Sequence, residues 1–310
     1  MQTILGAGGS IGVELAKSLT EYTNDIRLVG RNPQVVNPTD QLITADLLNQ
    51  EALNKAIKGS EVVYVTVGFP YQLKVWQENW PKAMSGIIEA CAKEQCRLVF
   101  FDNIYMYDPG YLGDMTEATP FNPPSKKGKV RAQVAEMVID AYETGKVEAL
   151  IARSADFYGP SIDRTSMLTE TVFKPFSQAK KATWMGSADR LHSFTYTPDA
   201  GKATALLGNT AEAFNQTWHL PTSSEQYTGK DFMKAIAEQM GAQDKYLTVS
   251  KLLTQMMGLF DPLMREMPEM MYQYTNDYYF NSSKFEEHFD MQPTTYLKGI
   301  EHVVSTDYAS

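Results

Sequence analysis

Apolar stretches typical of strands alternate with amphipathic stretches typical of helices through the first half of the chain. The apolar stretches are nearly unbroken runs of valine, isoleucine and leucine, and they lie at residues 2–5, 25–30, 41–46, 61–68, 97–102 and 147–154. The helical patterns cover residues 11–19, 50–59, 80–95 and 128–145. Strands that are apolar on both faces belong to a parallel sheet that helices cover on both sides. The pattern therefore predicts an α/β fold with a doubly wound parallel sheet over residues 1–160.

The alternation of strand and helix patterns becomes less regular after about residue 160, where polar loops become frequent. The methionine-rich stretch 255–274 predicts two short amphipathic helices that are broken near Asp261–Pro262. Because methionine fills irregular apolar gaps, we expect these helices to serve as a lid or as core packing. We expect residues 161–310 to form mainly a smaller substrate-binding domain, which can return elements to the sheet.

Composition excludes several classes of partner. The chain has 310 residues, 43% of them hydrophobic, and a net charge of −9. Nucleic acid and anionic lipid need a basic surface, so we expect neither as a partner. No apolar run approaches the roughly 20 residues of a membrane-spanning helix, and the start of the chain does not resemble a signal peptide. We therefore expect a cytoplasmic protein; the scattered histidines and the pair Cys91 and Cys96 predict no metal site.

A glycine-rich turn follows the first apolar stretch. Gly6, Gly9 and Gly12 lie between the first predicted strand and its helix. Glycine permits a tight turn, lets backbone N–H groups approach a pyrophosphate, and lets the helix pack on the strand. The helix N-terminus favours the anion. This context predicts a dinucleotide site that includes Ser10 and Ile11 at the start of the helix.

The end of the second strand indicates which dinucleotide is bound. NAD-binding proteins usually have an acid there for the ribose hydroxyls, whereas this chain has Arg31. An arginine suits a 2′-phosphate, so we expect NADP, with NAD possible; the alternative is that Arg31 stacks on adenine or faces solvent. Asp46 ends the next strand, where it can reach the adenine amino group or cap the following helix.

The motifs taken together resemble the extended short-chain dehydrogenase/reductase superfamily, and within it the NAD(P)-dependent epimerase/dehydratase family. They are the glycine turn at 6–12, "ADLL" at 45–48, "VTVG" at 65–68, "ARSADFYGP" at 152–160, "FTYTPDAGKA" at 194–203 and the C-terminal stretch 281–300. The resemblance implies a Rossmann fold, a nicotinamide cofactor that Val67 and Gly68 contact, and a small, often sugar-nucleotide, substrate. It also implies a possible homodimer through the long helices.

One family motif is missing from its expected place. The family's Tyr-xxx-Lys pair opens the helix after strand five, yet residues 123–136 contain no tyrosine. Lys127 or Gly128 stands where the tyrosine belongs, and Arg131 or Ala132 where the lysine belongs. The usual tyrosine acid/base therefore cannot be carried over to this chain.

Two cations share one face at the start of this helix. Lys127 and Arg131 are four residues apart, and their charges oppose the helix dipole. We expect them to hold ribose hydroxyls or an anionic substrate, with a solvated basic face as the alternative. A desolvated Lys127 can also act as a general acid or base. Lys126 and Lys129 are expected to face solvent.

The only Tyr-xxx-Lys spacing nearby is "YETGK", which contains Tyr142 and Lys146. The helix runs antiparallel to the strands, so its end lies on the side of the sheet opposite the ligand. Tyr142 comes about 14 residues, or roughly 20 Å, beyond the expected position. We therefore predict that this pair takes no part in catalysis.

Polar and aromatic side chains follow strand five, where parallel sheets bind ligands. Asn103 stands where the family places a serine or threonine, and it can hydrogen-bond the reacting oxygen. Tyr105 is a candidate proton donor. Tyr107 matches a common family aromatic, either in the substrate site or structural.

Further substrate-binding candidates follow strand six. Asp156 and Tyr158 face the same side of the sheet, and Asp156 is expected to shape the pocket or tie down its loop. His192 can reach the substrate from the second domain, although a lone histidine is more often structural.

Two functions fit these residues. The first is an atypical NAD(P)-dependent oxidoreductase or epimerase/dehydratase in which Asn103, Tyr105 and Lys127 polarise the substrate oxygen or move its proton. The second is a non-enzymatic NADP(H) sensor that resembles the NmrA-like regulatory proteins. The absence of the Tyr-xxx-Lys pair from its expected place suggests this alternative. The polar groups at the strand ends favour the enzyme.

Overall fold

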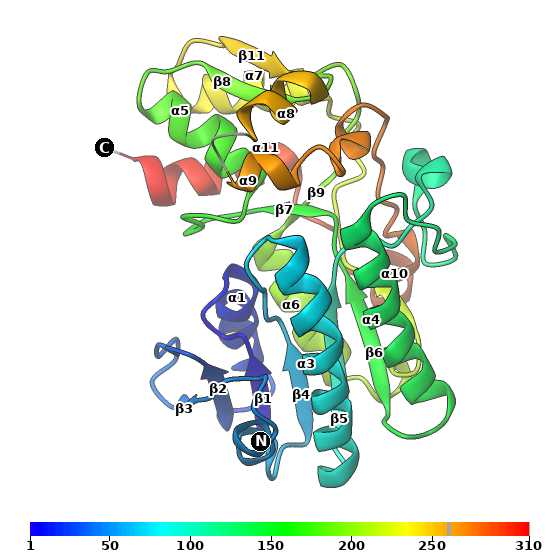
Figure 1. Ribbon diagram of the computed structural model, residues 1–310. Coiled ribbons are helices and arrows are strands. Elements are labelled where there is room, and N and C mark those ends of the chain that lie inside the picture. Colours follow the sequence, from blue (N-terminus) through cyan, green and yellow to red (C-terminus); the bar gives the residue numbers. More distant parts are fainter. Residues whose placement is uncertain (259–261, 310) are drawn as a thin grey trace. The chain divides into compact units, whose positions relative to one another are not determined.

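The chain divides into two compact units in the computed structural model, which describes residues 1–258 and 262–309 (Figure 1). The first unit combines residues 1–106, 127–154 and 198–220. The second combines residues 107–126, 155–197 and the chain from 221 onward. The units are therefore not two consecutive stretches: residues 107–126 and 155–160 belong to the second unit, and residues 198–220 belong to the first.

The first unit contains a seven-stranded parallel sheet with the order β10-β6-β5-β4-β1-β2-β3. Its strands are β1 (Gln2–Leu5), β2 (Ile26–Gly30), β3 (Gln41–Thr44), β4 (Val62–Val65), β5 (Arg97–Asp102), β6 (Ala149–Arg153) and β10 (Thr217–His219). The predicted doubly wound parallel sheet is confirmed. The short strand β10 comes from beyond residue 160 and pairs with β6, which the apolar pattern did not indicate.

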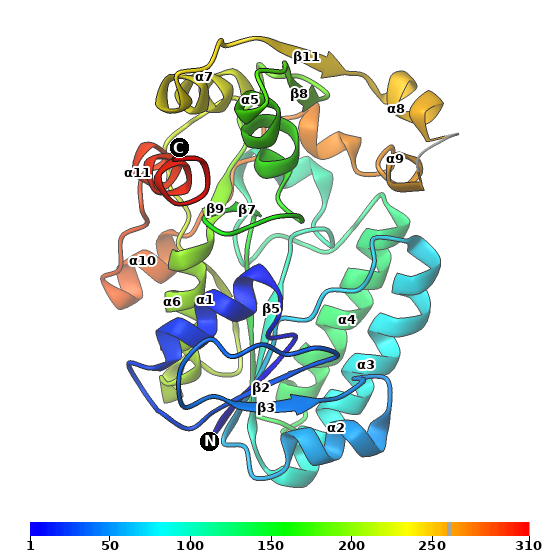
Figure 2. The ribbon, with the colours of Figure 1, turned by 90° about the vertical axis from the view of Figure 1, so that its left-hand side faces the viewer.

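Helices cover both faces of this sheet. They are α1 (Ser10–Leu19), α2 (Gln50–Ile57), α3 (Leu73–Glu94), α4 (Lys126–Glu143) and α6 (Thr197–Gly208), with the short turn η3 (Ala211–Ala213). Figure 2 shows α1 and α6 on one face and α3 and α4 on the other. Among the described residues, no helix combines the length and the apolar character needed to cross a membrane.

Helix α3 begins earlier than the sequence pattern predicted. The predicted helix began at Trp80. The helix instead begins at Leu73 and contains Pro81 in its interior. The buried rings of Trp76 and Trp80 hold this additional stretch, so packing outweighs the loss of one backbone hydrogen bond at Pro81.

The second unit contains two small parallel sheets and a group of short helices. The strands are β7 (Asp156–Tyr158) paired with β9 (Phe194–Tyr196), and β8 (Ala182–Met185) paired with β11 (Tyr246–Val249). The helices are α5 (Lys174–Ser177), α7 (Gly229–Met240), α8 (Lys251–Met257), α9 (Pro262–Glu266), α10 (Ser283–Phe289) and α11 (Tyr296–Val303). The shorter helical turns are η1 (Pro109–Asp114), η2 (Thr169–Phe173), η4 (Met271–Tyr274) and η5 (Val304–Tyr308). Buried aromatic rings, among them Trp184, Phe194 and Phe232, form the core of this unit.

The methionine-rich stretch forms short helices, as its pattern predicted. It contributes the end of α8, the whole of α9 and the turn η4. The predicted break near Asp261–Pro262 falls partly outside the described residues, since these resume at Pro262, where α9 begins.

Candidate cofactor and active site

The turn between β1 and α1 requires glycine at two positions. Gly6 has a φ of +95°, and a Cβ atom there would lie 2.5 Å from the Val67 backbone. A Cβ atom at Gly12 would lie 2.8 Å from both the Ala7 Cα atom and the Gly6 carbonyl oxygen. The first glycine thus lets the turn approach the end of β4, and the second lets α1 pack against the turn.

The start of α1 has the properties of an anion-binding site. Gly9 is its N-cap and has no side chain that could occupy the free N–H groups. The first turn contains Ser10 and Ile11 and no acidic residue. Gly8 and Gly9 are exposed, so the backbone is accessible. These residues therefore fit the pyrophosphate of a dinucleotide.

The ends of β2 and β3 present one cation and one anion. Arg31 is exposed after β2, and no described residue forms an ion pair with it. Asp46 is exposed after β3, and its Oδ1 atom accepts a hydrogen bond from the Leu48 N–H at 3.0 Å. Asn49 caps α2 by accepting from the Ala52 N–H at 3.0 Å. The alternative that Asp46 caps this helix is therefore wrong.

Lys127 is completely buried at the start of α4, where its exposed fraction is 0%. Its Nζ atom lies 4.7 Å from the centre of the Tyr71 ring, within the range of a cation–π interaction. Arg131 is buried one helical turn later. The alternative of a solvated basic face is therefore wrong, whereas Lys126 and Lys129 are exposed as predicted.

Arg131 belongs to a buried ion-pair cluster at the end of β5. Its guanidinium donates hydrogen bonds from Nε, at 2.9 Å, and from a terminal nitrogen to Asp102 Oδ1. The same guanidinium lies 4.2 Å from the centre of the Trp80 ring. A terminal nitrogen of Arg153 lies 3.5 Å from the other Asp102 oxygen. Because its charge is taken up by Asp102, Arg131 fixes α4 against the sheet instead of presenting a free cation to a ribose.

The residues after β5 form a compact turn on Asp102. The Asn103 N–H donates to Asp102 Oδ1 at 2.8 Å, and the Tyr105 N–H donates to Asn103 Oδ1 at 3.0 Å. The Tyr105 ring stacks on the Trp76 ring, with centres 6.1 Å apart. Trp76 also contacts Tyr71, whose ring faces Lys127. The predicted residues Asn103, Tyr105 and Lys127 are thus linked through two aromatic side chains, Tyr71 and Trp76, that no sequence motif indicated.

The second unit brings Asp156 and His192 together. The His192 Nε2 atom lies 3.0 Å from Asp156 Oδ2, and the Tyr274 hydroxyl donates to the same oxygen at 2.9 Å. The Asp156 N–H donates to the Tyr278 hydroxyl at 3.2 Å. The His192 ring is stacked between the two tyrosine rings, with centres 4.9 Å and 4.3 Å away. Within the described part of the chain, no three metal-ligating side chains come together.

Two predicted substrate-binding tyrosines lie in packed surroundings. Tyr158 has an exposed fraction of 0%, and its ring packs against Tyr196 at 5.3 Å and Tyr296 at 6.2 Å. Tyr107 is buried and forms a β-bridge with Phe121. Both positions give these residues a packing role, and neither ring lines an open surface.

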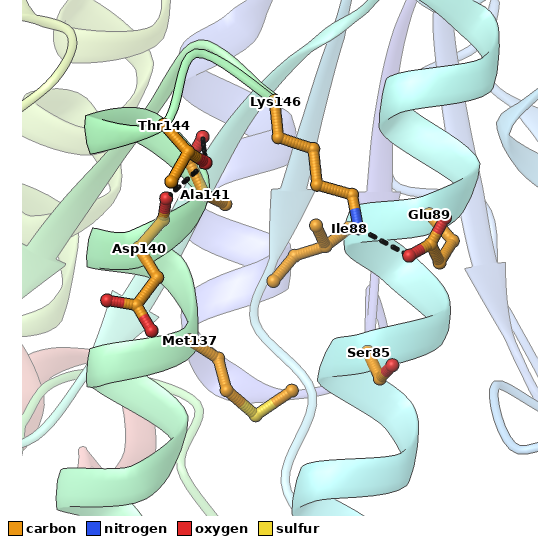
Figure 3. Close-up of a pocket in the computed structure, with 8 residues that line it drawn as sticks. All are labelled: Ser85, Ile88, Glu89, Met137, Asp140, Ala141, Thr144 and Lys146. Carbon is orange, nitrogen blue, oxygen red and sulfur yellow. Dashed lines mark hydrogen bonds and ion pairs between the residues drawn. The ribbon is translucent and has the colours of Figure 1, made fainter.

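The "YETGK" segment lies at the opposite end of α4, as its place in the chain predicted. Lys146 forms an ion pair with Glu89 across a surface hollow of about 230 Å³ between α3 and α4 (Figure 3). Burial, and then the adjacent Glu143 carboxylate, raise the pKa of Tyr142. A catalytic tyrosine needs the opposite shift, so this pair has neither the position nor the electrostatics of an acid/base pair.

The parallel sheet, the glycine turn and the uncapped helix start define a Rossmann-type α/β protein with a dinucleotide-binding turn. Residues 3–219 match the model of the NAD dependent epimerase/dehydratase family, and the chain belongs to this family. No protein with a curated description matches the sequence.

Solved structures of sugar-nucleotide enzymes share the fold at low sequence identity. The UDP-glucuronic acid 4-epimerase of Bacillus cereus, solved with UDP-glucuronic acid and NAD, has a TM-score of 0.81 and 17% identity, covering 99% of this chain and 98% of that one. The dTDP-glucose 4,6-dehydratase of Bacillus anthracis, solved with NAD, has a TM-score of 0.80 and 15% identity, with coverages of 98% and 95%. The UDP-glucose 4-epimerase of Thermus thermophilus, also with NAD, has a TM-score of 0.78 and 16% identity, with coverages of 99% and 98%.

Proposed function

We propose that the protein is an NADP-dependent oxidoreductase or epimerase/dehydratase-like enzyme that acts on a small carbonyl or hydroxyl compound with an atypical acid/base residue. The observation that carries this proposal is the complete burial of Lys127 at the start of α4. A buried lysine costs free energy, so a protein keeps one mainly where the charge or the proton is used. The start of α4 is also where this family places its catalytic tyrosine.

The first unit supplies the residues that would hold the cofactor. Gly6, Gly9 and Gly12 would receive the pyrophosphate, with Ser10 and Ile11 beside them. Bound at this turn, the nicotinamide cofactor supplies or accepts a hydride at the substrate carbon.

The adenosine half would meet the ends of β2, β3 and β4. Arg31 is exposed and would pair with a 2′-phosphate, which favours NADP over NAD. Asp46 is exposed and would accept a hydrogen bond from the adenine amino group. Val67 and Gly68 after β4 would contact the cofactor, as the family resemblance implies.

Lys127 would perform the proton transfer. Its ammonium would donate a proton to the substrate oxygen as the carbonyl is reduced, and in the reverse direction its amine would take the proton from the hydroxyl. The side-chain amide of Asn103 would hydrogen-bond the same oxygen and orient it, because no described residue accepts from this amide. Tyr105 would border the reacting group through its ring and hydroxyl.

Asp156 would bind a substrate hydroxyl in the second unit. Its carboxylate is 17% exposed, and His192 and Tyr274 both hold its Oδ2 atom. Carboxylates held in this way accept hydrogen bonds from hydroxyl groups at a fixed position. The relatives that act on nucleotide sugars support such a hydroxyl-bearing substrate as one class.

Turnover by the purified protein tests the proposal. The protein is mixed with NADPH and with a broad panel of aldehydes, ketones and nucleotide sugars, and the absorbance of NADPH is followed while its affinity is measured separately. We expect NADPH to bind and to be oxidised by at least one carbonyl class. Tight binding of NADPH without oxidation or epimerisation of any compound would contradict the enzyme and favour an NADP(H) sensor.

A further inference from the structure

Aromatic rings and a buried cation gather where β4 and β5 end in the first unit. We define the aromatic cluster as Tyr71, which follows β4, Trp76 in the first turns of α3, and Tyr105, which follows β5. The Tyr71 and Trp76 rings meet edge to face at 5.4 Å, and the Trp76 and Tyr105 rings are stacked at 6.1 Å. Lys127 adjoins the cluster through the Tyr71 ring.

One donor of this cluster has its hydrogen-bonding capacity unused. The Trp76 indole N–H is buried and has no hydrogen-bond partner among the described residues. An unsatisfied buried donor costs about 1–3 kcal/mol, and an acceptor that binds to it would remove this cost. Trp76 is 6% exposed, which holds the indole in place for that acceptor.

The half-buried members of the cluster are its accessible part. Tyr71 and Tyr105 are both of intermediate exposure, and the fully buried Lys127 lies against the Tyr71 ring. Aromatic faces and edges bind other flat, apolar groups with a favourable geometry. The nearby N–H and ammonium groups favour an oxygen acceptor. The combination therefore suits a molecule in which an oxygen acceptor is attached to a flat apolar group.

We propose that the aromatic cluster is the specificity site for a carbonyl compound whose carbonyl is conjugated to a planar apolar group, such as an aryl ketone. The planar group contacts Tyr71 and Tyr105, and the carbonyl oxygen accepts from the Trp76 indole in addition to Asn103 and Lys127. This inference rests on the proposed function, because it names the substrate class of the same enzyme. This substrate class distinguishes the chain from enzymes that recognise a nucleoside diphosphate as the main part of their substrate.

Binding of matched probes tests this specificity. Saturation-transfer difference NMR is recorded with acetophenone, with cyclohexyl methyl ketone and with UDP-glucose, each in the presence of saturating NADP⁺. Acetophenone and cyclohexyl methyl ketone both carry an acetyl group on a six-membered ring. Only the acetophenone ring is planar and conjugated to the carbonyl. We expect acetophenone to bind at least about tenfold more tightly than cyclohexyl methyl ketone and than UDP-glucose.

Two tryptophan variants locate the binding site. Trp76→Phe keeps an aromatic ring and removes the indole N–H, so we expect it to weaken acetophenone binding about two- to tenfold. Trp80→Phe is the matched control, because its indole N–H is also unpartnered among the described residues but its ring packs on Arg131. We expect Trp80→Phe to leave acetophenone binding unchanged, and equal losses in both variants would contradict the proposal.

The remaining outcomes separate this inference from the proposed function. Preferential binding of UDP-glucose or of cyclohexyl methyl ketone, or no binding of any probe, would overturn the aromatic specificity site. Oxidation of NADPH by nucleotide sugars or aliphatic carbonyls alone would also overturn it and leave the proposed enzyme intact. Selective acetophenone binding that Trp76→Phe weakens, without NADPH oxidation by any carbonyl, would support the site and contradict the enzyme.

Discussion

The two ends of α4 carry similar side chains in opposite surroundings. At its start, Lys127 is fully buried against the Tyr71 ring, one turn before the buried Arg131–Asp102 ion pair. Just beyond its end, the Lys146 side chain is 44% exposed and pairs with Glu89, which is 59% exposed. The sequence motif of a catalytic pair lies at the second end, and the buried charges lie at the first.

The difference shows which kind of charge carries information about function. An exposed ion pair contributes about 0–1 kcal/mol and can form wherever two long side chains meet. A buried charge is costly, so it is retained where a partner or a reaction needs it. Burial and position at the carboxyl ends of the strands therefore indicate which end of α4 is the active end. The presence of a Tyr-xxx-Lys motif alone does not.

The largest expected effect comes from removing Asp102, the anion at the end of β5 that pairs with Arg131 near the start of α4. Asp102→Ala leaves Arg131 and Arg153 buried without their carboxylate, and we expect the free energy of unfolding to fall by about 3–5 kcal/mol. Glu89→Ala removes the α3 anion that pairs with Lys146 beyond the other end of α4, and we expect a loss below about 1 kcal/mol. Urea unfolding followed by circular dichroism measures the free energy of unfolding of both variants. Equal losses would show that the two ion pairs do not differ in their contribution to stability.

The next effect tests whether the cofactor binds at the same edge of the sheet as Lys127. Gly6→Ala places a Cβ atom 2.5 Å from the Val67 backbone at a φ of +95°. Such strain costs about 1–3 kcal/mol or distorts the turn, so we expect at least about a tenfold loss of NADPH affinity. Gly113→Ala is the control, because a Cβ atom there meets nothing within 4 Å and Gly113 lies in η1, outside the glycine turn. Retention of full affinity by Gly6→Ala would argue against this site.

A smaller effect concerns the choice between NADP and NAD. Arg31→Ala removes the exposed cation after β2, and a hydrogen bond to a charged phosphate contributes about 1.5–3 kcal/mol. We expect the NADPH affinity to fall about tenfold or more while the NADH affinity stays the same. Calorimetric titration with both cofactors measures this, and a parallel loss for both would show that Arg31 does not recognise the 2′-phosphate.

The smallest expected effect belongs to the tyrosine at the far end of α4. Tyr142→Phe removes a hydroxyl to which no described residue hydrogen-bonds, so we expect the free energy of unfolding to change by less than about 0.5 kcal/mol. NADPH binding and NADPH oxidation are expected to be unchanged. A large loss of turnover in this variant would contradict the placement of the active end at Lys127.

The sequence predicted most of the parallel sheet because apolar runs alternate with helical patterns and a glycine turn lies between β1 and α1. It did not predict β10, since three residues carry no periodicity and their pairing with β6 depends on the return of the chain. It placed Lys127 and Arg131 on one helix face but left open whether that face was buried. Helix periodicity alone does not distinguish a buried charge from an exposed one.

The candidate site was only partly predictable for a similar reason. Asp156 and His192 were each expected to bind substrate, but their contact results from the pairing of β7 with β9, which sets Asp156 opposite Phe194. Tyr274 joins them from a segment whose methionine-rich sequence predicted a lid or core packing. Trp76 was missed because the predicted helix began after it. Long-range pairing is not encoded in any local pattern, so these contacts needed the structure.

A matched pair of lysine variants tests the central claim most directly. Lys127→Met and Lys146→Met each replace an ammonium by an apolar side chain of similar length, at the two ends of the same helix. Steady-state NADPH oxidation and NADPH affinity are measured for both with a carbonyl that the natural protein reduces. We predict at least a hundredfold loss of kcat for Lys127→Met with unchanged NADPH affinity, and full activity for Lys146→Met. Equal activity of the two variants, or a loss confined to Lys146→Met, would contradict the account.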